Sequence, residues 1–229
     1  MCPFHCCQSN NNRVFYPLLK CSFALLNFWY FIGKTLLPSL VWRQQSDEKV
    51  VYLTFDDGPH PEITPWVMEE LDKVGAKGTF FMVGDNIRKH PYLVNKVSDR
   101  NHSIGNHTMH HVKGWRMSSQ EYLKDVQDFR DLGSYDAQFG LFRPPYGQIN
   151  LKSIQALNSD YKIVMWDVLT KDYLKTLNVS KAQRRIQRNT SSGSIIVFHD
   201  SEKAKKNLKE LLPEYLQFLK REGYKMKAL

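Results

Sequence analysis

Hydrophobic positions follow two alternating patterns along most of this chain. From Lys49 onward, short apolar runs rich in β-branched and aromatic residues alternate with longer segments whose apolar residues recur every three to four positions. The first pattern is typical of buried strands, and the second is typical of amphipathic helices. The apolar runs predict about seven strands, at Val50–Phe55, Gly78–Val83, His102–Gly105, Leu141–Arg143, Lys162–Trp166, Ser194–His199 and Tyr224–Ala228.

Helices are predicted between these strands. Pro65 lies near the start of the first helix and Gly75 follows its end. Ser118 and Glu121 have the spacing of a capping box ahead of the third helix. The predicted helices are Ile63–Val74, His90–Asp99, Ser119–Leu132, Leu151–Leu157, Ser180–Arg188 and Lys203–Glu222. Such alternation predicts an α/β fold with a parallel sheet, either open and doubly wound or closed into a barrel.

The first 48 residues follow neither pattern. Their apolar stretch Cys21–Gly33 has 13 uncharged residues, fewer than the roughly 20 that a membrane-spanning helix needs. A signal peptide would need a small-x-small cleavage site after the apolar stretch, and none follows. We therefore interpret residues 1–48 as a separate leader and residues 49–229 as one domain. Four interpretations of the leader stay open: a helix that lies on the domain or, through residues 14–41, on a membrane surface; an uncleaved anchor; an imperfect signal; or a start assigned upstream of the true one.

The composition is that of an ordinary globular protein. Of the 229 residues, 42% are hydrophobic and 24% are charged, which excludes wholesale disorder and fibrous architectures. All four cysteines lie within the first 21 residues. The remainder of the chain must therefore be stabilised by a packed core rather than by disulfides.

The net charge of +9 arises mainly near the C-terminus. Residues 171–229 contain 14 Lys or Arg against 6 Asp or Glu. Glutamates lie among the lysines of the last predicted helix, which indicates a solvated face of mixed sign. We expect no nucleic acid partner from this pattern, and attraction to an anionic cell-wall polymer or membrane surface is the milder interpretation.

Polar residues follow the first and third predicted strands, at the edge where sites collect in parallel sheets. Asp56 and Asp57 end an apolar run, where a partly buried carboxylate needs a partner or a metal. His107 and His111 stand four residues apart, so both imidazoles could meet one cation. Taken alone, these motifs could be an exposed Asp-Gly turn and a solvated His-rich loop. Together they predict a His2Asp set that leaves a coordination position for water, as in catalytic metal sites.

Three further strand ends carry chemically active side chains. Arg143 precedes two prolines, which hold the backbone rigid and suit a guanidinium placed beside a carboxylate. Asp167 and Asp172 follow the fifth strand, and His199 ends the sixth. Each alone has an ordinary structural explanation, as a Pro-rich turn, a solvated acidic loop or a buried histidine. The five polar strand ends as a set are far more specific, and they predict a single active site.

These residues resemble the polysaccharide deacetylases of carbohydrate esterase family 4, which share the NodB homology domain. The resemblance extends over about Lys49–Leu229 and does not include the leader. It rests on five motifs: TFDDGP at Thr54–Pro59, HTMHH at His107–His111, RPPYG at Arg143–Gly147, WDVLTKDY at Trp166–Tyr173 and SIIVFHD at Ser194–Asp200. It implies a distorted (β/α) barrel with about seven parallel strands. It also implies metal-dependent removal of N-acetyl, or O-acetyl, groups from a polysaccharide such as peptidoglycan or a chitin-like oligosaccharide.

The resemblance implies a role for each motif residue. The implied catalytic residues are Asp56 as general base, His199 as general acid, and Arg143 and Asp172 as the groups that orient these two. The implied ligands of a divalent metal, zinc ahead of cobalt or manganese, are Asp57, His107 and His111. The implied substrate contacts are the backbone N–H of Tyr146 at the oxyanion and, around the acetyl group, Tyr173, Val197 and Phe198.

Two motifs depart from the family's usual pattern. The fourth motif often reads Asp-x-x-Asp-Trp, and here Leu169 replaces the first acid and Tyr173 the tryptophan. The fifth motif has Val197 where leucine is common. No metal ligand or proton carrier is lost, so we predict an active hydrolase, with a catalytically weak or inactive carbohydrate-binding homologue as the alternative. We expect a monomer, located in the cell envelope or at a membrane if the leader's apolar segment is genuine and in the cytoplasm otherwise.

Overall fold

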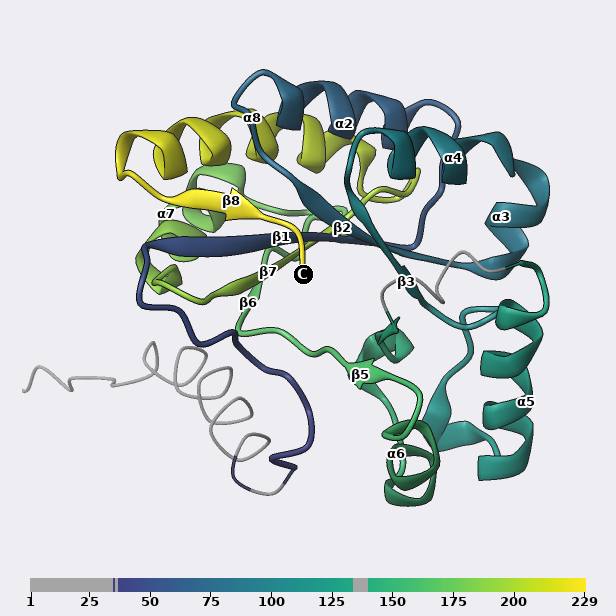
Figure 1. Cartoon of the computed structure of the whole chain (residues 1–229). Helices are drawn as coiled ribbons and strands as arrows, with labels where there is room; N and C mark the ends of the chain where they lie inside the picture. The colour runs from purple at the N-terminus through teal and green to yellow at the C-terminus, as the bar shows by residue number, and fades with distance from the viewer. Residues whose placement is uncertain (1–34, 36, 134–139) are drawn as a thin grey trace, which may run out of the picture.

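Parallel strands form one curved sheet in the computed structural model of the chain, which describes residues 35, 37–133 and 140–229 (Figure 1). The strands are β1 Val50–Asp56, β2 Gly78–Met82, β3 Ser103–Asn106, β4 Leu141–Phe142, β5 Lys162–Ile163, β6 Val168–Leu169, β7 Ile195–His199 and β8 Lys225–Lys227. Their spatial order is β5-β4-β3-β2-β1-β7-β6, and β8 pairs with the first residues of β1. Because all of these ladders are parallel, the carboxyl ends of the strands gather at one end of the barrel.

Helices cover the outside of this sheet. They are α2 Ile63–Asp72, α3 Gly84–Lys89, α4 Tyr92–Asp99, α5 Ser119–Arg130, α6 Leu151–Leu157, α7 Val179–Asn189 and α8 Lys205–Arg221, with 3₁₀ turns η1 Gly114–Arg116 and η2 Pro145–Gly147. In Figure 1, α2, α4 and α8 lie over one side of the sheet, and α5 and α6 lie near β5. The predicted capping box is confirmed, since Glu121 N donates to Ser118 Oγ and Ser118 N donates to Glu121 Oε2.

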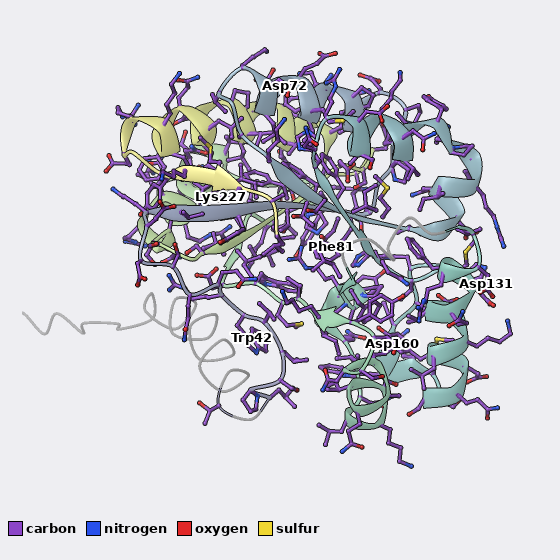
Figure 2. All side chains as sticks on the ribbon, viewed as in Figure 1. Trp42, Asp72, Phe81, Asp131, Asp160 and Lys227 are labelled. Carbon is purple, nitrogen blue, oxygen red and sulfur yellow. The ribbon has the colours of Figure 1, made fainter. Side chains whose placement is uncertain are left out.

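The strands are apolar on both faces because both faces are covered. On the outer face, Phe55 stacks on Phe80 and Phe198, with ring centroids 5.0 and 5.9 Å apart, within the core that also contains residues of α2 and α8. A second buried cluster contains Phe81, Leu141, Val164 and Ile195. Figure 2 shows Phe81 among packed side chains near the middle of the molecule. The predicted (β/α) barrel is therefore confirmed.

The chain closes the barrel with a segment that precedes β1. We call residues 40–44 the seam segment. Val41 N donates to Ile163 O at 2.9 Å beside β5, and Gln44 N donates to Gly193 O at 3.0 Å beside β7. Gly193 has a φ of +82°, and a side chain there would collide with the carbonyl oxygen of Gln44. The seam segment thus joins the two sides of the sheet, while the boundary at residue 48 stays a prediction.

One predicted strand differs from the structure, and two short elements were not predicted. The strand predicted at Lys162–Trp166 ends at Ile163, because the chain then crosses to the other edge of the sheet. There Val168–Leu169 forms β6, which the sequence pattern did not predict. Helix α3 was also missed, since its six residues are too few to show a helical period.

The apolar stretch Cys21–Gly33 lies outside the described residues. Within the part of the chain that the structure describes, no helix is both long and apolar enough to cross a bilayer. The four interpretations of the leader therefore stay predictions.

Candidate active site

The predicted site residues meet at the carboxyl end of the barrel, beside a cleft of about 730 Å³. Eight of them line the cleft, namely Asp56, Asp57, His107, His111, Tyr146, Tyr173, Val197 and His199. Arg143 and Asp172 are fully buried and bond directly to residues of that set. Phe198, the remaining implied substrate contact, is buried against Phe55 on the outer face of the sheet and does not line the cleft. The parallel ladders explain this convergence, because they bring the ends of β1, β3, β4 and β7 to the same edge.

Three potential metal ligands lie together at the ends of β1 and β3. Asp57 Oδ1 is 3.1 Å from His111 Nε2 and 3.8 Å from His107 Nε2. One ligand atom from each of the three residues lies within 4.8 Å of the others. A single cation could therefore be bound by all three side chains.

The protonation of these groups fits a cation. His107 Nδ1 donates to the carbonyl oxygen of Arg143 at 2.7 Å, which leaves its Nε2 with a lone pair on the side of Asp57. Burial lowers the pKa of His107 to about 4, so the ring is neutral at pH 7. Burial alone would raise the pKa of Asp57, but the hydrogen bond with His111 and the charges of nearby imidazoles outweigh it and lower that pKa. One carboxylate with two imidazoles is a donor set that suits zinc and neighbouring metals.

Asp56 is held on the cleft floor by a buried guanidinium. Arg143 Nη1 donates to Asp56 Oδ1 and to Thr54 Oγ1, both at 2.7 Å. The other nitrogens of Arg143 donate to the carbonyl oxygens of Val164 and Met165 at 3.2 and 3.0 Å. Because the guanidinium is fixed by four acceptors, the Asp56 carboxylate has both a compensating charge and one orientation.

His199 ends β7, next to Asp56 of β1, and it is paired with a buried carboxylate. Asp172 accepts hydrogen bonds from His199 Nδ1 at 2.7 Å and from His199 N at 2.8 Å. Asn207 Nδ2 donates to the Asp172 carbonyl at 2.6 Å and steadies that segment. Burial alone would lower the pKa of His199, but the charge and hydrogen bond of Asp172 outweigh it and raise the pKa to about 9. The ring is therefore protonated at pH 7 and has a proton to donate.

Aromatic and apolar side chains form the walls between these groups. The ring of Tyr146 lies 4.8 Å from that of His111, and the ring of Tyr173 meets His199 edge-on at 5.0 Å. Val197 is buried in β7 at the base of the cleft. These residues give the cleft apolar lining next to the three potential metal ligands.

Backbone strain is concentrated at this site. Among the described residues, six that are not glycine have a positive φ. Five of them lie in the site motifs, namely Asp57, Thr108, His111, Tyr146 and Lys171. Strained backbone of this kind is retained where surrounding contacts hold functional side chains in one position.

One predicted strand-end acid lies elsewhere. Asp167 accepts hydrogen bonds from Ile195 N at 2.7 Å and Ser194 Oγ at 2.9 Å, at the amino end of β7. Its carboxylate also faces Arg43 of the seam segment at 3.5 Å. The expectation that Asp167 belongs to the active site is therefore wrong, because the chain crosses the barrel after β5 and places this residue at the opposite end of β7.

Asp200 holds the backbone of the turn that carries the paired aspartates. Its backbone N–H donates to the Asp56 carbonyl at 3.0 Å, and its carboxyl accepts a hydrogen bond from Thr64 Oγ1 at 2.5 Å. Burial raises the pKa of Asp200 to about 8, so the carboxyl is largely neutral at pH 7. Asp200 therefore anchors the turn that carries Asp56 and Asp57 rather than adding a charge to it.

The end of β2 contributes cleft residues that sequence analysis missed. Asp85, Asn86 and Lys89 of α3 line the cleft, and Asn86 Nδ2 donates to the Asp57 carbonyl at 2.8 Å. The same strand-end rule that singled out the other motifs applies here, because these residues follow directly after β2.

Comparison with known proteins gives consistent matches. Residues 43–162 match the family model for polysaccharide deacetylase. A peptidoglycan-N-acetylglucosamine deacetylase of Bacillus cereus is 33% identical over 200 residues, which cover 85% of this chain and 93% of that protein. Peptidoglycan-N-acetylglucosamine deacetylase PgdA of Listeria monocytogenes is 29% identical over 201 residues, but the match covers 41% of that protein and 84% of this chain.

A solved structure shows the same fold. The crystal structure of the Bc1960 peptidoglycan N-acetylglucosamine deacetylase has a TM-score of 0.79 and 27% sequence identity to this chain. The match covers 88% of this chain and 95% of the other. The described barrel is thus shared over nearly the whole length of that structure.

Proposed function

Because this chain belongs to the polysaccharide deacetylase family, we propose that it is a metal-dependent hydrolase that removes N-acetyl groups from an N-acetylglucosamine-containing polymer such as peptidoglycan. One observation carries the proposal: a His2Asp set, an Arg-held carboxylate and an Asp-held histidine face one cleft. The name of the Bacillus cereus relative supports peptidoglycan as the polymer.

The metal would be held by Asp57, His107 and His111, and zinc suits this donor set ahead of cobalt or manganese. When bound, such a cation acidifies a water molecule and polarises the acetyl carbonyl. Asp56 is the adjacent residue in the chain, and its salt bridge with Arg143 fixes its carboxylate on the cleft floor. We assign to Asp56 the removal of the proton from the attacking water.

The leaving nitrogen needs a proton, and His199 carries one at pH 7. His199 and Asp56 end neighbouring strands, and each has its own buried partner, Asp172 for the acid and Arg143 for the base. Tyr146 has a positive φ of 59° beside His111, and its backbone N–H is our candidate donor to the oxyanion. Each step of the hydrolysis thus has a residue of this chain in position.

The two departures from the family's usual motifs do not favour an inactive homologue. Tyr173 keeps an aromatic ring against His199, where the family often has tryptophan. Leu169 lines the cleft, and its carbonyl accepts a hydrogen bond from Arg185 at 3.1 Å. We expect these changes to alter the shape of the acetyl pocket and therefore the choice of substrate, rather than to abolish turnover.

Acetate release from purified protein tests this proposal. Substrates are N-acetylglucosamine oligomers, peptidoglycan and O-acetylated xylan, each assayed as purified, after chelation, and after addition of Zn²⁺, Co²⁺ or Mn²⁺. We expect release from the N-acetylated substrates, loss on chelation and recovery with metal. Asp56→Asn should retain the metal and lose roughly 10²- to 10⁴-fold in rate. Metal binding without acetate from any substrate would contradict the proposal.

The location of the protein is a separate proposal. Its relatives are named for cell-wall substrates, so we propose a place in the cell envelope. Fractionation of cells that express the full chain, against a chain that begins at Leu37, would test whether the leader directs it there. Equal distribution of the two would contradict a targeting role for the leader.

A further inference from the structure

Two loops that carry site residues are joined along one side of the cleft. We call residues 111–119 and 145–152 the rim loops. Lys113 Nζ lies 4.9 Å from the centre of the Tyr146 ring, and Gly114 closely approaches the Gln148 carbonyl. Two hydrogen bonds also join the loops, from Trp115 Nε1 to Ile149 O at 3.3 Å and from Ser119 Oγ to Asn150 Oδ1 at 3.0 Å. These contacts hold both loops as one surface.

This surface is unusually apolar for one that faces solvent. Trp115 is 69% exposed, Leu151 is 64% exposed and Tyr146 is 54% exposed. In the described part of the chain, the only other exposed large hydrophobic residues are Tyr92 and Leu174, and both are less exposed than these three. The indole N–H of Trp115 is bonded inward to Ile149, so solvent meets the apolar part of a ring whose position is set. Exposed apolar groups that gather in this way mark binding surfaces.

The charge on the rim loops has one sign. They contain Lys113, Arg116 and Lys152 and no Asp or Glu. Among the described residues, no carboxylate forms an ion pair with any of the three. Across the cleft the signs are mixed, because Asp85 and Glu202 lie there with lysines. The rim loops therefore offer apolar surface together with cations that no described carboxylate neutralises.

We propose that the rim loops form an outer subsite that binds a neighbouring sugar of the same glycan strand, with Trp115 against the sugar ring and Arg116 and Lys113 toward a carboxylate carried by that strand. The inference rests on the proposed function and narrows its substrate to a glycan that bears carboxylates. Neutral chitin-like oligomers would use the ring contact alone.

Continuity with the cleft favours a glycan over a lipid surface. Tyr146 belongs to both regions, since it lines the cleft and its ring contacts His111. Tyr146 is joined to the other rim loop by Lys113, and Trp115 of that loop bonds to Ile149, so a polymer that leaves the cleft over Tyr146 would have the rim loops as its next surface. Amphipathic rings such as indole supply a large contact area with little loss of side-chain freedom, which suits the apolar face of a sugar.

The ring contact is tested by chain length. Acetate release is measured on N-acetylglucosamine oligomers from dimer to hexamer for the wild type, Trp115→Ala and Trp115→Phe. We expect Trp115→Ala to reduce the hexamer-to-dimer ratio of kcat/KM roughly tenfold, about 1.4 kcal/mol, through KM, and Trp115→Phe to restore most of it. Tyr92→Ala removes an exposed ring that lies outside the rim loops and is the matched control. An unchanged ratio in Trp115→Ala would overturn the inference while the wild-type activity upheld the proposed function.

The charge contact is tested by substrate and salt. Arg116→Gln should weaken kcat/KM on carboxylate-bearing peptidoglycan fragments, reduce its salt dependence, and leave the neutral hexamer unaffected. Lys220→Gln, at the end of α8, is the matched control for loss of one exposed cation. Equal effects of Arg116→Gln on both substrates would overturn the charge assignment.

Binding provides a readout that does not need turnover. Co-sedimentation of the full chain with insoluble peptidoglycan should fall in Trp115→Ala. If the wild type binds through Trp115 yet releases no acetate from any glycan, the proposed function fails and the subsite stands. If Trp115→Ala instead loses only its binding to vesicles of anionic phospholipid, the surface contacts lipid and the inference is overturned.

Discussion

Replacement of Asp172 by asparagine should change the pH range in which the protein works. The substitution keeps the size of the side chain and removes the negative charge that His199 faces at 2.7 Å. Burial would then lower the pKa of His199 with no carboxylate on Asp172 to oppose it. We expect that pKa to fall from about 9 toward the ordinary value of 6.5, because burial still lowers it while the smaller effects of the Asp57 and Asp56 charges still raise it.

The size of the effect follows from the two values. Because one pKa unit corresponds to about 1.4 kcal/mol, the rise from 6.5 to about 9 represents roughly 3 kcal/mol of preference for the protonated ring. At pH 8 the protonated fraction of His199 would fall from roughly nine-tenths to roughly one-thirtieth, and at pH 6 it would change little. The variant should therefore lose about 30-fold in kcat/KM at pH 8 and recover most of it at pH 6.

Stability should follow the same groups. The pKa of His199 in the folded protein lies above its unfolded value of 6.5, so the stabilisation by Asp172 is complete below pH 6.5 and is lost as the pH rises through about 9. Urea unfolding of the two proteins should differ most near pH 6 and least above pH 9. The Asp172→Asn variant should therefore lose the most stability near pH 6, where it loses the least activity.

The assay is the pH profile of acetate release over about four pH units, from roughly 5.5 to 9.5. This range includes the expected His199 pKa of the wild type and that of the variant. Asp167→Asn is the matched control. Asp167 lies between β5 and β7, as Asp172 does, but its carboxylate bonds to Ser194 and Ile195 rather than to His199. It should leave the alkaline limb of the profile in place. An equal loss at pH 6 and pH 8 in Asp172→Asn would refute the assignment of His199 as the acid.

Three other substitutions test the site and the fold. His107→Ala should lose the bound divalent ion on dialysis, measured by elemental analysis, and full retention would show that the ligands are other residues. Arg143→Met leaves Asp56 buried without its partner and should destabilise the protein by about 3–5 kcal/mol in urea unfolding, so a cost under about 1 kcal/mol would show that the pair is not needed. Ser118→Ala removes the capping box of α5 and should cost about 1 kcal/mol in the same assay without changing acetate release. A change in the metal content of Ser118→Ala would indicate that α5 supports the ligand loop more directly than its cap suggests.

The sequence was most informative where a strand end and a motif coincide. Asp56 ends β1 and His107 follows β3, and because both strands pair in parallel with β2, the two residues reach the same edge of the sheet. The roles of Arg143 and Asp172 were implied by the family resemblance, because nothing in their spacing indicates which carboxylate or imidazole each one meets. The structure supplies those pairings through backbone positions far apart in the chain.

The errors have a common physical cause. Strand β6 has only two residues, and α3 only six, so neither shows a period that a pattern can detect. Without β6, Asp167 looks like another strand-end acid, although it lies at the opposite end of β7 from His199. Asn86 was missed because α3 was missed, even though it follows directly on a predicted strand.

The seam segment limits how the leader of this protein could be exchanged for another. Val41 and Gln44 supply backbone partners to Ile163, Met165 and Gly193, and a junction made at the start of β1 would remove all of them. Each buried backbone group left without a partner costs about 1–3 kcal/mol, a large part of the stability of an ordinary domain. A chimera with a foreign targeting sequence should therefore be joined upstream of Leu37, so that the barrel keeps the seam segment that connects its two sides.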